Sequence, residues 1–266
     1  MNPFLLFRRS ALVLCGCSLL WMQGSAPLAA APAATAPTRG GALSATASPE
    51  TGRQAESAAL AAKVQARYQQ VSSLAAVYQR KSIFVAAGND SERSVEGEGC
   101  LLWARPTSLR LDQQEPRKEL IVIQQNSVWW VRPQRGRADI YPLDRFTSGL
   151  RSLMDALGGL ARVDESFTVE PAPEEDRTPA VAGQSILVLK PKEKHTDLKR
   201  LVLWFNPEDM ILQGFRIVSL IGDVTEYRLQ QVQVNPSLAA DSFTYQAPAD
   251  YKLTDHRSQA PSGDPR

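Results

Sequence analysis

Few residues in this chain have the types and spacing that catalysis or metal binding requires. Its two histidines, His195 and His256, lie in polar segments without a cysteine or carboxylate at metal-ligand spacing, so no zinc site is expected. Cys100 lies beside Glu98 and apolar residues, which raise the pKa of a thiol, and we interpret it as packing. The acidic run 174–176 is typical of a solvated surface. Without a nucleophile or phosphate-loop motif, the sequence predicts a non-enzyme that holds no cofactor or metal.

Arg105 is the charged residue whose placement needs an explanation. It follows a strand of bulky apolar residues that ends near Trp103, and it precedes Pro106 and a second strand in which Leu109 and Leu111 alternate with polar residues. An unpaired guanidinium at the lip of an apolar sheet is costly, so we expect Arg105 to have a defined polar partner. A solvated turn position is the alternative that the local spacing leaves open.

Both ends of the chain are predicted to lie outside its folded domain. Residues 1–33 have the charged, apolar and small-residue segments of a signal peptide, so the mature protein is expected in the periplasm. Residues 34–53 and 254–266 have almost no large apolar side chains, which predicts a disordered linker and a disordered tail. Residues 54–253 are expected to form one domain.

A second processing pattern overlaps the signal peptide. The segment Leu14–Cys17 resembles the site at which bacterial lipoproteins are cleaved and acylated on a cysteine, so a lipid-anchored protein is the alternative to a soluble one. Cleavage at the alanine-rich site instead leaves Cys100 alone in the mature chain, so no internal disulfide could form.

The net charge excludes one class of partner. The formal charge is +2, and Arg8 and Arg9 of the signal peptide account for it, so the mature chain is close to neutral. Nucleic-acid binding requires a basic excess, so we expect no nucleic-acid partner. We expect a monomer.

Most of the domain is predicted to consist of antiparallel strands. Short apolar or alternating segments follow one another with polar turns between them, which favours a meander. Within the segment 225–234 the apolar side switches, and this predicts a bulge near Gln230–Gln231. A first strand is predicted to begin after Ser73, where Leu74, Ala76 and Tyr78 alternate, but periodicity alone does not fix this boundary. The other predicted strands are Val95–Trp103, one that begins with Leu109–Leu111, Leu120–Ile123, Val128–Val131, Ile186–Leu189, Leu201–Phe205, Ile211–Ile221, Thr225–Val234 and Phe243–Tyr245.

Two amphipathic helices are predicted beside these strands. Residues 55–70 carry apolar side chains at helical spacing, and so does a second segment marked by Leu150, Leu153, Met154, Leu157 and Ala161. The second helix could simply cover the sheet.

Many apolar strands and few helices predict a mainly β (α+β) fold. We expect a curled sheet, an incomplete antiparallel β-barrel, lidded by short helices around a hydrophobic cavity. Only one of Trp129 and Trp130 can point inward, because neighbours in a strand face opposite sides. The predicted cavity residues are Leu109, Leu111, Trp129, Leu153, Met154, Leu157, Leu203 and Phe215.

Five short pieces of sequence occur in a specific order and spacing. They are Val71–Ser73 with Tyr78–Gln79, Gly97–Gly99 with Trp103 and Arg105–Pro106, Val128–Pro133, Leu187–Lys192, and Phe243–Pro248. Together they resemble the LolA family, the periplasmic carriers of outer-membrane lipoproteins. The resemblance runs from about Leu60 to Leu253.

The resemblance implies a fold, a cargo and partners. It implies an incomplete barrel whose helices cover a hydrophobic cavity for the acyl chains of lipoproteins. It also implies that Arg105 bonds backbone groups of the lid and holds the cavity shut, and that Leu109 is a pocket residue. The implied partners are an inner-membrane ABC transporter that releases lipoproteins and an outer-membrane receptor.

The sequence departs from the family pattern in four respects: the linker is unusually long, the segment 150–160 matches only by pattern, and two short motifs differ. Gln125–Ser127 replaces a frequent Asp-Gly, and Ala249–Asp250 stands where a glycine is usual. A receptor-like protein lipidated on Cys17, a carrier of another lipid such as a glycolipid, and a sensor that binds lipid-anchored partners without transporting them therefore remain as alternatives.

The alanine-rich site predicts a mature N-terminus near residues 30–33. Cell fractionation with N-terminal sequencing should find that terminus in the periplasmic fraction, because small residues there suit signal peptidase. An acylated Cys17 at the mature terminus would instead favour the receptor-like alternative.

Overall fold

A computed structural model describes residues 49–85, 93–143, 151, 153–154, 157, 163–177, 182–192 and 197–258. The chain divides into two units, Met1–Ala45 and Thr46–Arg266, and every described residue belongs to the second. Within these described ranges no helix is long and apolar enough to cross a membrane.

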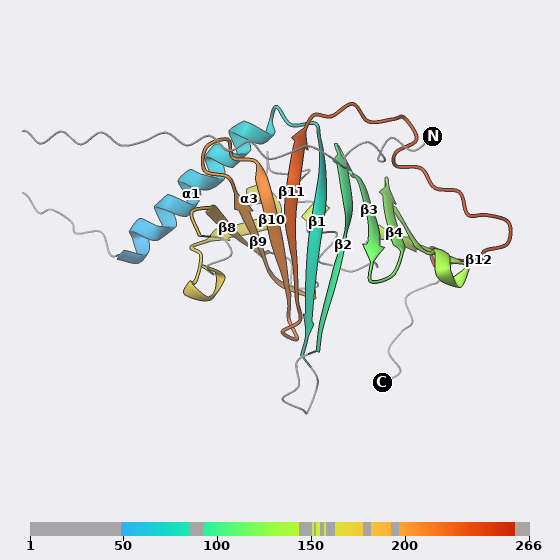
Figure 1. Cartoon of the computed structure of the whole chain (residues 1–266). Helices are drawn as coiled ribbons and strands as arrows, with labels where there is room; N and C mark the ends of the chain where they lie inside the picture. Colours follow the sequence, from blue (N-terminus) through green and yellow to red (C-terminus); the bar gives the residue numbers. More distant parts are fainter. Residues whose placement is uncertain are drawn as a thin grey trace, which may run out of the picture. The chain divides into compact units, whose positions relative to one another are not determined.

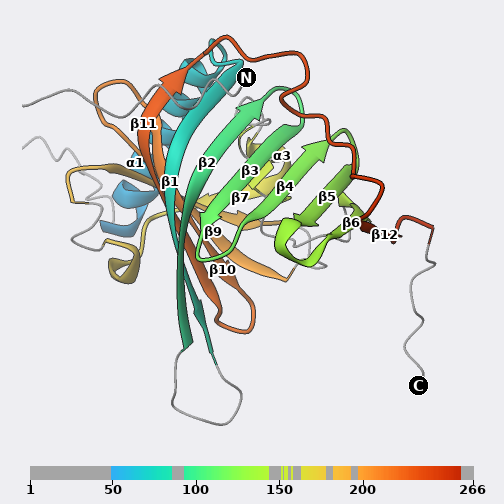
Figure 2. The same ribbon diagram turned by 45° about the vertical axis from the view of Figure 1, so that its right-hand side comes forward.

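The fold is mainly β, as predicted, and consists of one curled sheet of twelve strands in the order β12-β6-β5-β4-β3-β2-β1-β11-β10-β9-β8-β7 (Figures 1 and 2). Neighbouring strands pair antiparallel except β12 and β6, which pair in parallel. Because β12 and β7 end the order without pairing to each other, the barrel is incomplete. The strands are β1 Ser73–Phe84, β2 Arg93–Ala104, β3 Ser108–Glu115, β4 Glu119–Gln124, β5 Ser127–Arg132, β6 Arg137–Pro142, β7 Phe167–Glu170, β8 Ser185–Pro191, β9 Leu198–Phe205, β10 Leu212–Ser219, β11 Val224–Val234 and β12 Lys252–Asp255.

Two helices with described bounds accompany the sheet, and residues 151, 153, 154 and 157 are also helical. The helix α1 spans Pro49–Tyr68 and leads directly into β1, while the four-residue helix α3 spans Val163–Ser166 and leads into β7. Two short 3-10 turns, η2 (Pro133–Arg135) and η5 (Glu174–Asp176), lie in connecting segments.

Each face of the sheet carries its own apolar cluster, because successive strand residues point to opposite sides. The inner cluster combines side chains from α1 and from strands along the whole sheet, including Leu74, Leu101, Leu189 and Leu229. Two smaller clusters lie on the outer face, one around Val202 and Trp204 and another around Val122 and Val131.

The bulge expected near Gln230–Gln231 is confirmed. Ala75 pairs with Gln233 and Val77 pairs with Gln230, so two residues of β11 lie opposite the single residue Ala76. Gln231 has a left-handed φ of 53°, which suits the extra residue of a bulge. The bulge explains why the apolar side of this strand switches partway along it.

The structure differs from the sequence predictions at several elements. The helix begins at Pro49 rather than at residue 55, because its first turns are polar and lack apolar periodicity, although Pro49 and Glu50 suit a helix N-terminus. The strands β6 and β7 were not predicted, since charged residues and short length hide their alternation. Residues 243–245 do not form a strand, because they belong to a segment that crosses the outer face.

The segment 235–258, called the strap below, begins where β11 ends and includes β12. At its start, the Asn235 carboxamide oxygen accepts hydrogen bonds from the amides of Ser72 (2.7 Å) and Ser73 (3.3 Å), and its amide group donates to the Gln70 carbonyl (2.9 Å). Farther along, the Tyr245 ring packs edge-on against Trp129. The strap therefore joins the end of α1 to the outer face of β5.

At its far end, the strap contacts the buried carboxylate of Asp139. Asp139 of β6 is fully buried and accepts hydrogen bonds from Arg132 and from Arg137, and His256 lies 3.2 Å from its Oδ1. The His256 ring also stacks on Tyr141, with centroids 4.4 Å apart. Part of the segment expected to be a disordered tail is therefore ordered, because β12 pairs with β6 and His256 finds these two partners.

The pKa of Asp139 depends on a balance of opposing effects. Burial alone would raise the pKa, but the hydrogen bonds from Arg137, His256 and Arg132 outweigh it and hold the pKa below its usual value. Since the pKa is lower in the folded state, the stability that this carboxylate contributes is present above about pH 4 and is lost as the pH falls through the folded value.

The substitution Asp139→Asn should lower the free energy of unfolding by about 3 kcal/mol at pH 7, because it removes the buried charge that pairs with Arg132 and Arg137. The difference from the wild type should narrow below about pH 4, as measured by urea denaturation. Asp255→Asn, at an exposed ion pair with Arg257, is the control and should change little. Equal stability of wild type and Asp139→Asn at pH 7 would contradict this account.

Candidate functional site

The structure brings seven of the eight predicted cavity residues into the inner cluster. Each of the seven is at most 3 % exposed, and they come from β3, β9, β10 and the segment 153–157. They are Leu109, Leu111, Leu153, Met154, Leu157, Leu203 and Phe215. The concave side of the sheet is thus lined by aliphatic and aromatic side chains that belong to one continuous cluster.

Three helical residues, Leu153, Met154 and Leu157, which are referred to below as the segment 153–157, pack in the inner cluster on the concave face. Leu153, Met154 and Leu157 are helical and are at most 2 % exposed, and their spacing places them on one side of a helix. Leu150 and Ala161, which were predicted to belong to the same helix, lie outside the described residues. The buried side of this segment supplies apolar contacts that a sheet open at both edges cannot supply itself.

Trp129 is the predicted cavity residue that the structure does not bring to the inner cluster. It packs on the outer face against the cluster of Val122 and Val131, and its ring meets Tyr245 at a centroid distance of 5.5 Å. The reason is strand alternation, since its neighbour Val128 takes the inner position. Trp129 therefore helps to seat the strap.

Arg105 has the defined polar partner that its position requires. Its guanidinium Nη2 donates a hydrogen bond to the carbonyl oxygen of Tyr68, the last residue of α1, and its backbone amide donates to the Ser72 carbonyl (2.9 Å). The last carbonyls of a helix lack partners within the helix and carry partial negative charge. A guanidinium suits this place, and it ties the turn between β2 and β3 to the end of α1.

Tyr68 connects the same helix end to the opposite part of the sheet. Its hydroxyl oxygen accepts a hydrogen bond from the Leu212 amide (3.1 Å), and its ring packs edge-on against Phe205 with centroids 6.2 Å apart. Burial raises the pKa of Tyr68, so the phenol stays neutral. The end of α1 is therefore held by β2 on one side and by β9 and β10 on the other.

The rest of α1 is held more loosely. Val64 is fully buried, but the first half of the helix is mostly exposed, and a side-chain hydrogen bond links it to β7, from Gln54 Nε2 to the Val169 carbonyl (2.9 Å). Figure 1 shows α1 lying beside the part of the sheet that contains β8, β9 and β10. The helix therefore has most of its described contacts with the sheet at its C-terminal end.

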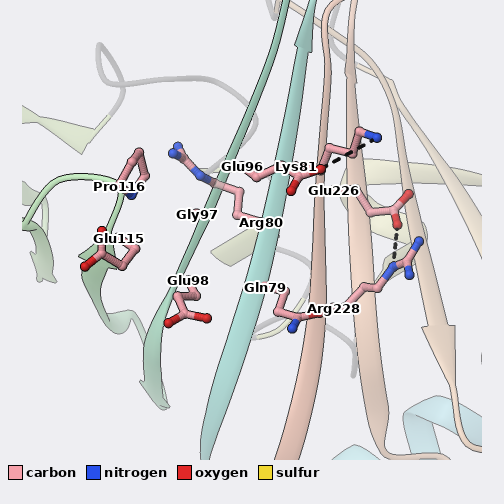
Figure 3. A pocket seen from close by; sticks show the side chains of 10 residues that line it. All are labelled: Gln79, Arg80, Lys81, Glu96, Gly97, Glu98, Glu115, Pro116, Glu226 and Arg228. Atoms are coloured by element: carbon pink, nitrogen blue, oxygen red, sulfur yellow. Dashed lines mark hydrogen bonds and ion pairs between the residues drawn. The ribbon is translucent and has the colours of Figure 1, made fainter.

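A pocket of about 500 Å³ along β1, β2 and β11 has a different character (Figure 3). Its charged side chains are partly paired, with 3.9 Å between Lys81 Nζ and Glu96 Oε1 and 2.9 Å between Arg228 Nε and Glu226 Oε1. Arg80 extends over Gly97 toward Pro116 in the close-up view. Ionised walls cannot shelter hydrocarbon, so this pocket is not a site for acyl chains.

The outer face also holds an ionic network that corrects one sequence interpretation. Asp176 is buried rather than solvated, and its carboxylate accepts hydrogen bonds from Arg200 and Arg216 at 2.9 Å each. Arg216 also donates to Glu226, where burial would raise the pKa but the hydrogen bonds from Arg216 and Arg228 lower it. A buried carboxylate requires such partners, and here they fix the loop around η5 on β9 and β10.

Comparison with known proteins identifies the family. The family model described as "Outer membrane lipoprotein carrier protein LolA" matches residues 79–246 of this chain. The chain belongs to the LolA family. The match begins within β1, so α1 and the Tyr68 carbonyl that Arg105 contacts lie before it.

Relatives named outer-membrane lipoprotein carrier protein are about a quarter identical to this LolA-family chain over the aligned residues. The protein of Methylobacillus flagellatus is 25% identical over 170 residues, which cover 64% of this chain and 77% of the relative. That of Actinobacillus pleuropneumoniae is 23% identical over 207 residues, which cover 78% and 89%.

Solved structures are more distant. An uncharacterised conserved protein from Thermus thermophilus matches with a TM-score of 0.45 at 13% identity, over 75% of this chain and 99% of that protein. A LolA superfamily protein from Nitrosomonas europaea matches with a TM-score of 0.38 at 11% identity, over 71% and 97%.

Two features of this LolA-family interior were not predicted from the sequence. Tyr68 was assigned only to a helix, yet its carbonyl and hydroxyl both serve as anchors. Within the described part of the chain, the indole Nε1 of Trp103 and the Nε of Arg105 are buried without a hydrogen-bond partner. Neither feature can be predicted from a local sequence pattern, because both depend on which elements contact each other across the interior.

The substitution Leu157→Glu should loosen the cover of the inner cluster, because an ionised carboxylate cannot stay in an apolar interior. Fluorescence of a dye that brightens on apolar surfaces should rise severalfold, while the far-ultraviolet circular dichroism of the sheet persists. Leu253→Glu, on exposed β12, is the matched control and should leave the dye signal unchanged. Unchanged fluorescence in a folded Leu157→Glu protein would rule out a covering role for this segment.

Proposed function

We propose that this protein is a periplasmic carrier that takes up the acyl chains of lipoproteins on its concave face and brings them from the inner to the outer membrane. The observation that carries the proposal is the inner cluster, a continuous apolar lining closed by the segment 153–157, in a chain of the LolA family. The names of the relatives point to the same cargo.

The physical need for such a carrier follows from the cargo. Each acyl CH₂ group exposed to water costs about 0.8 kcal/mol, so a lipoprotein with several chains does not cross an aqueous space unshielded. If the covering side chains leave the inner face and acyl chains replace them, one apolar contact is exchanged for another. The exchange is then nearly balanced, which a carrier requires because it must also release its cargo.

Arg105 is proposed to favour the closed, empty form. Its charge-assisted hydrogen bond to the Tyr68 carbonyl would contribute roughly 1.5–3 kcal/mol, which is enough to bias the cover and small enough to be overcome by bound chains. Arg105 takes part in no chemical step in this proposal; it acts on the position of α1.

The proposed partners are an inner-membrane ABC transporter that supplies lipoproteins and an outer-membrane receptor that accepts them. The Leu14–Cys17 pattern supports a second candidate, a lipid-anchored receptor-like protein with the same interior. A carrier of another lipid, such as a glycolipid, remains the other candidate. Mass spectrometry of the mature N-terminus and of the lipid that co-purifies with the protein would distinguish the three.

Arg105→Leu should still accept lipoprotein but should pass it on more slowly, because the empty form no longer regains the bond to α1 when cargo leaves. Arg105→Lys should be intermediate, since an ammonium keeps the charge but lacks the planar fork. Uptake and onward transfer of a radiolabelled lipoprotein measure both steps.

Arg110→Leu is the matched control for this experiment. Arg110 lies in the same hairpin and also donates to a backbone carbonyl, that of Ser242 in the strap (3.2 Å), but it does not contact α1. Transfer by this variant should resemble the wild type. If Arg105→Leu passed cargo on as fast as the wild type, the closing role would be wrong and a structural turn position would remain.

A further inference from the structure

Trp103 holds a buried hydrogen-bond donor that nothing in the described structure satisfies. The residue is 0 % exposed, and its indole Nε1 has no acceptor among the described residues. Buried tryptophan N–H groups normally find a partner, because an unsatisfied donor loses its bond to water without compensation. Such a donor in a binding protein suggests that the ligand brings the acceptor.

The register of the sheet places Trp103 in the wall of the proposed cargo site. It pairs with Leu74 on β1 and with Leu109 on β3, and all three side chains belong to the inner cluster. It lies two residues before Arg105, whose Nε is likewise buried without an acceptor among the described residues. Two unsatisfied donors therefore lie at the same end of the inner face.

The chemistry of an acylated cargo matches this arrangement. Hydrocarbon chains accept no hydrogen bonds. Each chain, however, is joined to the rest of the lipoprotein through an ester or amide, whose carbonyl oxygen is a hydrogen-bond acceptor. We infer that the indole N–H of Trp103 donates to the carbonyl oxygen of an acyl ester or amide, and that this contact fixes where the head end of a chain lies. The inference rests on the proposed function and names the linkage that the site recognises.

The dimensions of the inner face agree with this direction of binding. From Trp103 the apolar wall runs along β2 to Gly99, which pairs with buried Tyr78, a span of about 14 Å at roughly 3.4 Å per residue. One acyl chain spans about half of a bilayer core that is about 30 Å thick, or roughly 15 Å. Beyond that level the register brings the charged Arg80 opposite Gly97. A chain whose carbonyl contacts Trp103 therefore fits the apolar part of β2.

The test compares two synthetic lipopeptides that differ only in their linkage. One carries diacylglyceryl ester chains and the other carries dialkyl ether chains of the same length, which have no carbonyl. For each protein, the measured quantity is the ratio of its affinity for the ester form to its affinity for the ether form. This ratio should be about tenfold larger in the wild type than in Trp103→Phe, as one hydrogen bond to a previously unsatisfied donor allows. Taking the ratio across the two proteins cancels the difference in hydrophobicity between the ligands.

Trp204→Phe is the matched control, because Trp204 is buried to a similar degree but lies in the outer cluster. It should keep the ester preference of the wild type. A diacyl phospholipid, compared with its dialkyl ether form, is the third arm of the test. If Trp103→Phe loses the preference for the ester form here too, the result would support the carbonyl contact and identify a glycerophospholipid as a second source of the linkage. Equal ester preference in wild type and Trp103→Phe would overturn the inference.

A measurement on the unmodified protein keeps the inference testable if Trp103→Phe does not fold. The indole ¹⁵N–¹H signal of Trp103 should move downfield on binding the ester lipopeptide and stay in place with the ether lipopeptide. Binding of both lipopeptides without that difference would refute the carbonyl contact and leave the carrier function intact. Failure of the wild type to bind either lipopeptide would refute both proposals together.

Discussion

The rest of the structure follows from one constraint: a sheet that does not close leaves its concave apolar face for other elements to cover. Twelve strands curl around the inner cluster, yet β12 and β7 remain separate edges. Burial of that face therefore depends on α1 and on the segment 153–157, which contribute Val64, Tyr68, Leu153, Met154 and Leu157. A closed barrel would bury the same residues within the sheet itself, whereas this open sheet needs side chains from other elements to complete their burial.

The polar contacts of the described residues fasten α1 and the strap to the sheet at several points. Tyr68 is bonded to Leu212, Asn235 to the start of β1, and Asp139 to Arg132, Arg137 and His256. The hydrogen bond from the Arg105 guanidinium adds a contact between the β2–β3 turn and the last residue of α1, beside the backbone bond from Arg105 to Ser72. Under the proposed function, this added contact would favour the closed, empty form.

Features that depend on residues close together in the sequence could be predicted from it. The strands of the meander and the bulge in β11 follow from alternation, and the need for a partner at Arg105 follows from the cost of an unpaired charge. The face of the sheet on which Trp129 lies could not be predicted, because strand alternation permits either Trp129 or Trp130 to point inward. The burial of Asp176 and the order of the strap depend on arginines and aromatic rings far away in the chain, and no local pattern contains that information.

The parallel pairing of β12 with β6 has a consequence for the behaviour of the protein in a crowded compartment. An exposed edge strand has unpaired backbone N–H and C=O groups, with which a strand of another polypeptide can pair. Such pairing is a common first step of aggregation. Here the strap supplies a strand that covers β6, and the opposite margin, β7, is only four residues long and is followed by Pro171. A long open sheet with an apolar interior thus presents little template for self-association at its two short marginal strands.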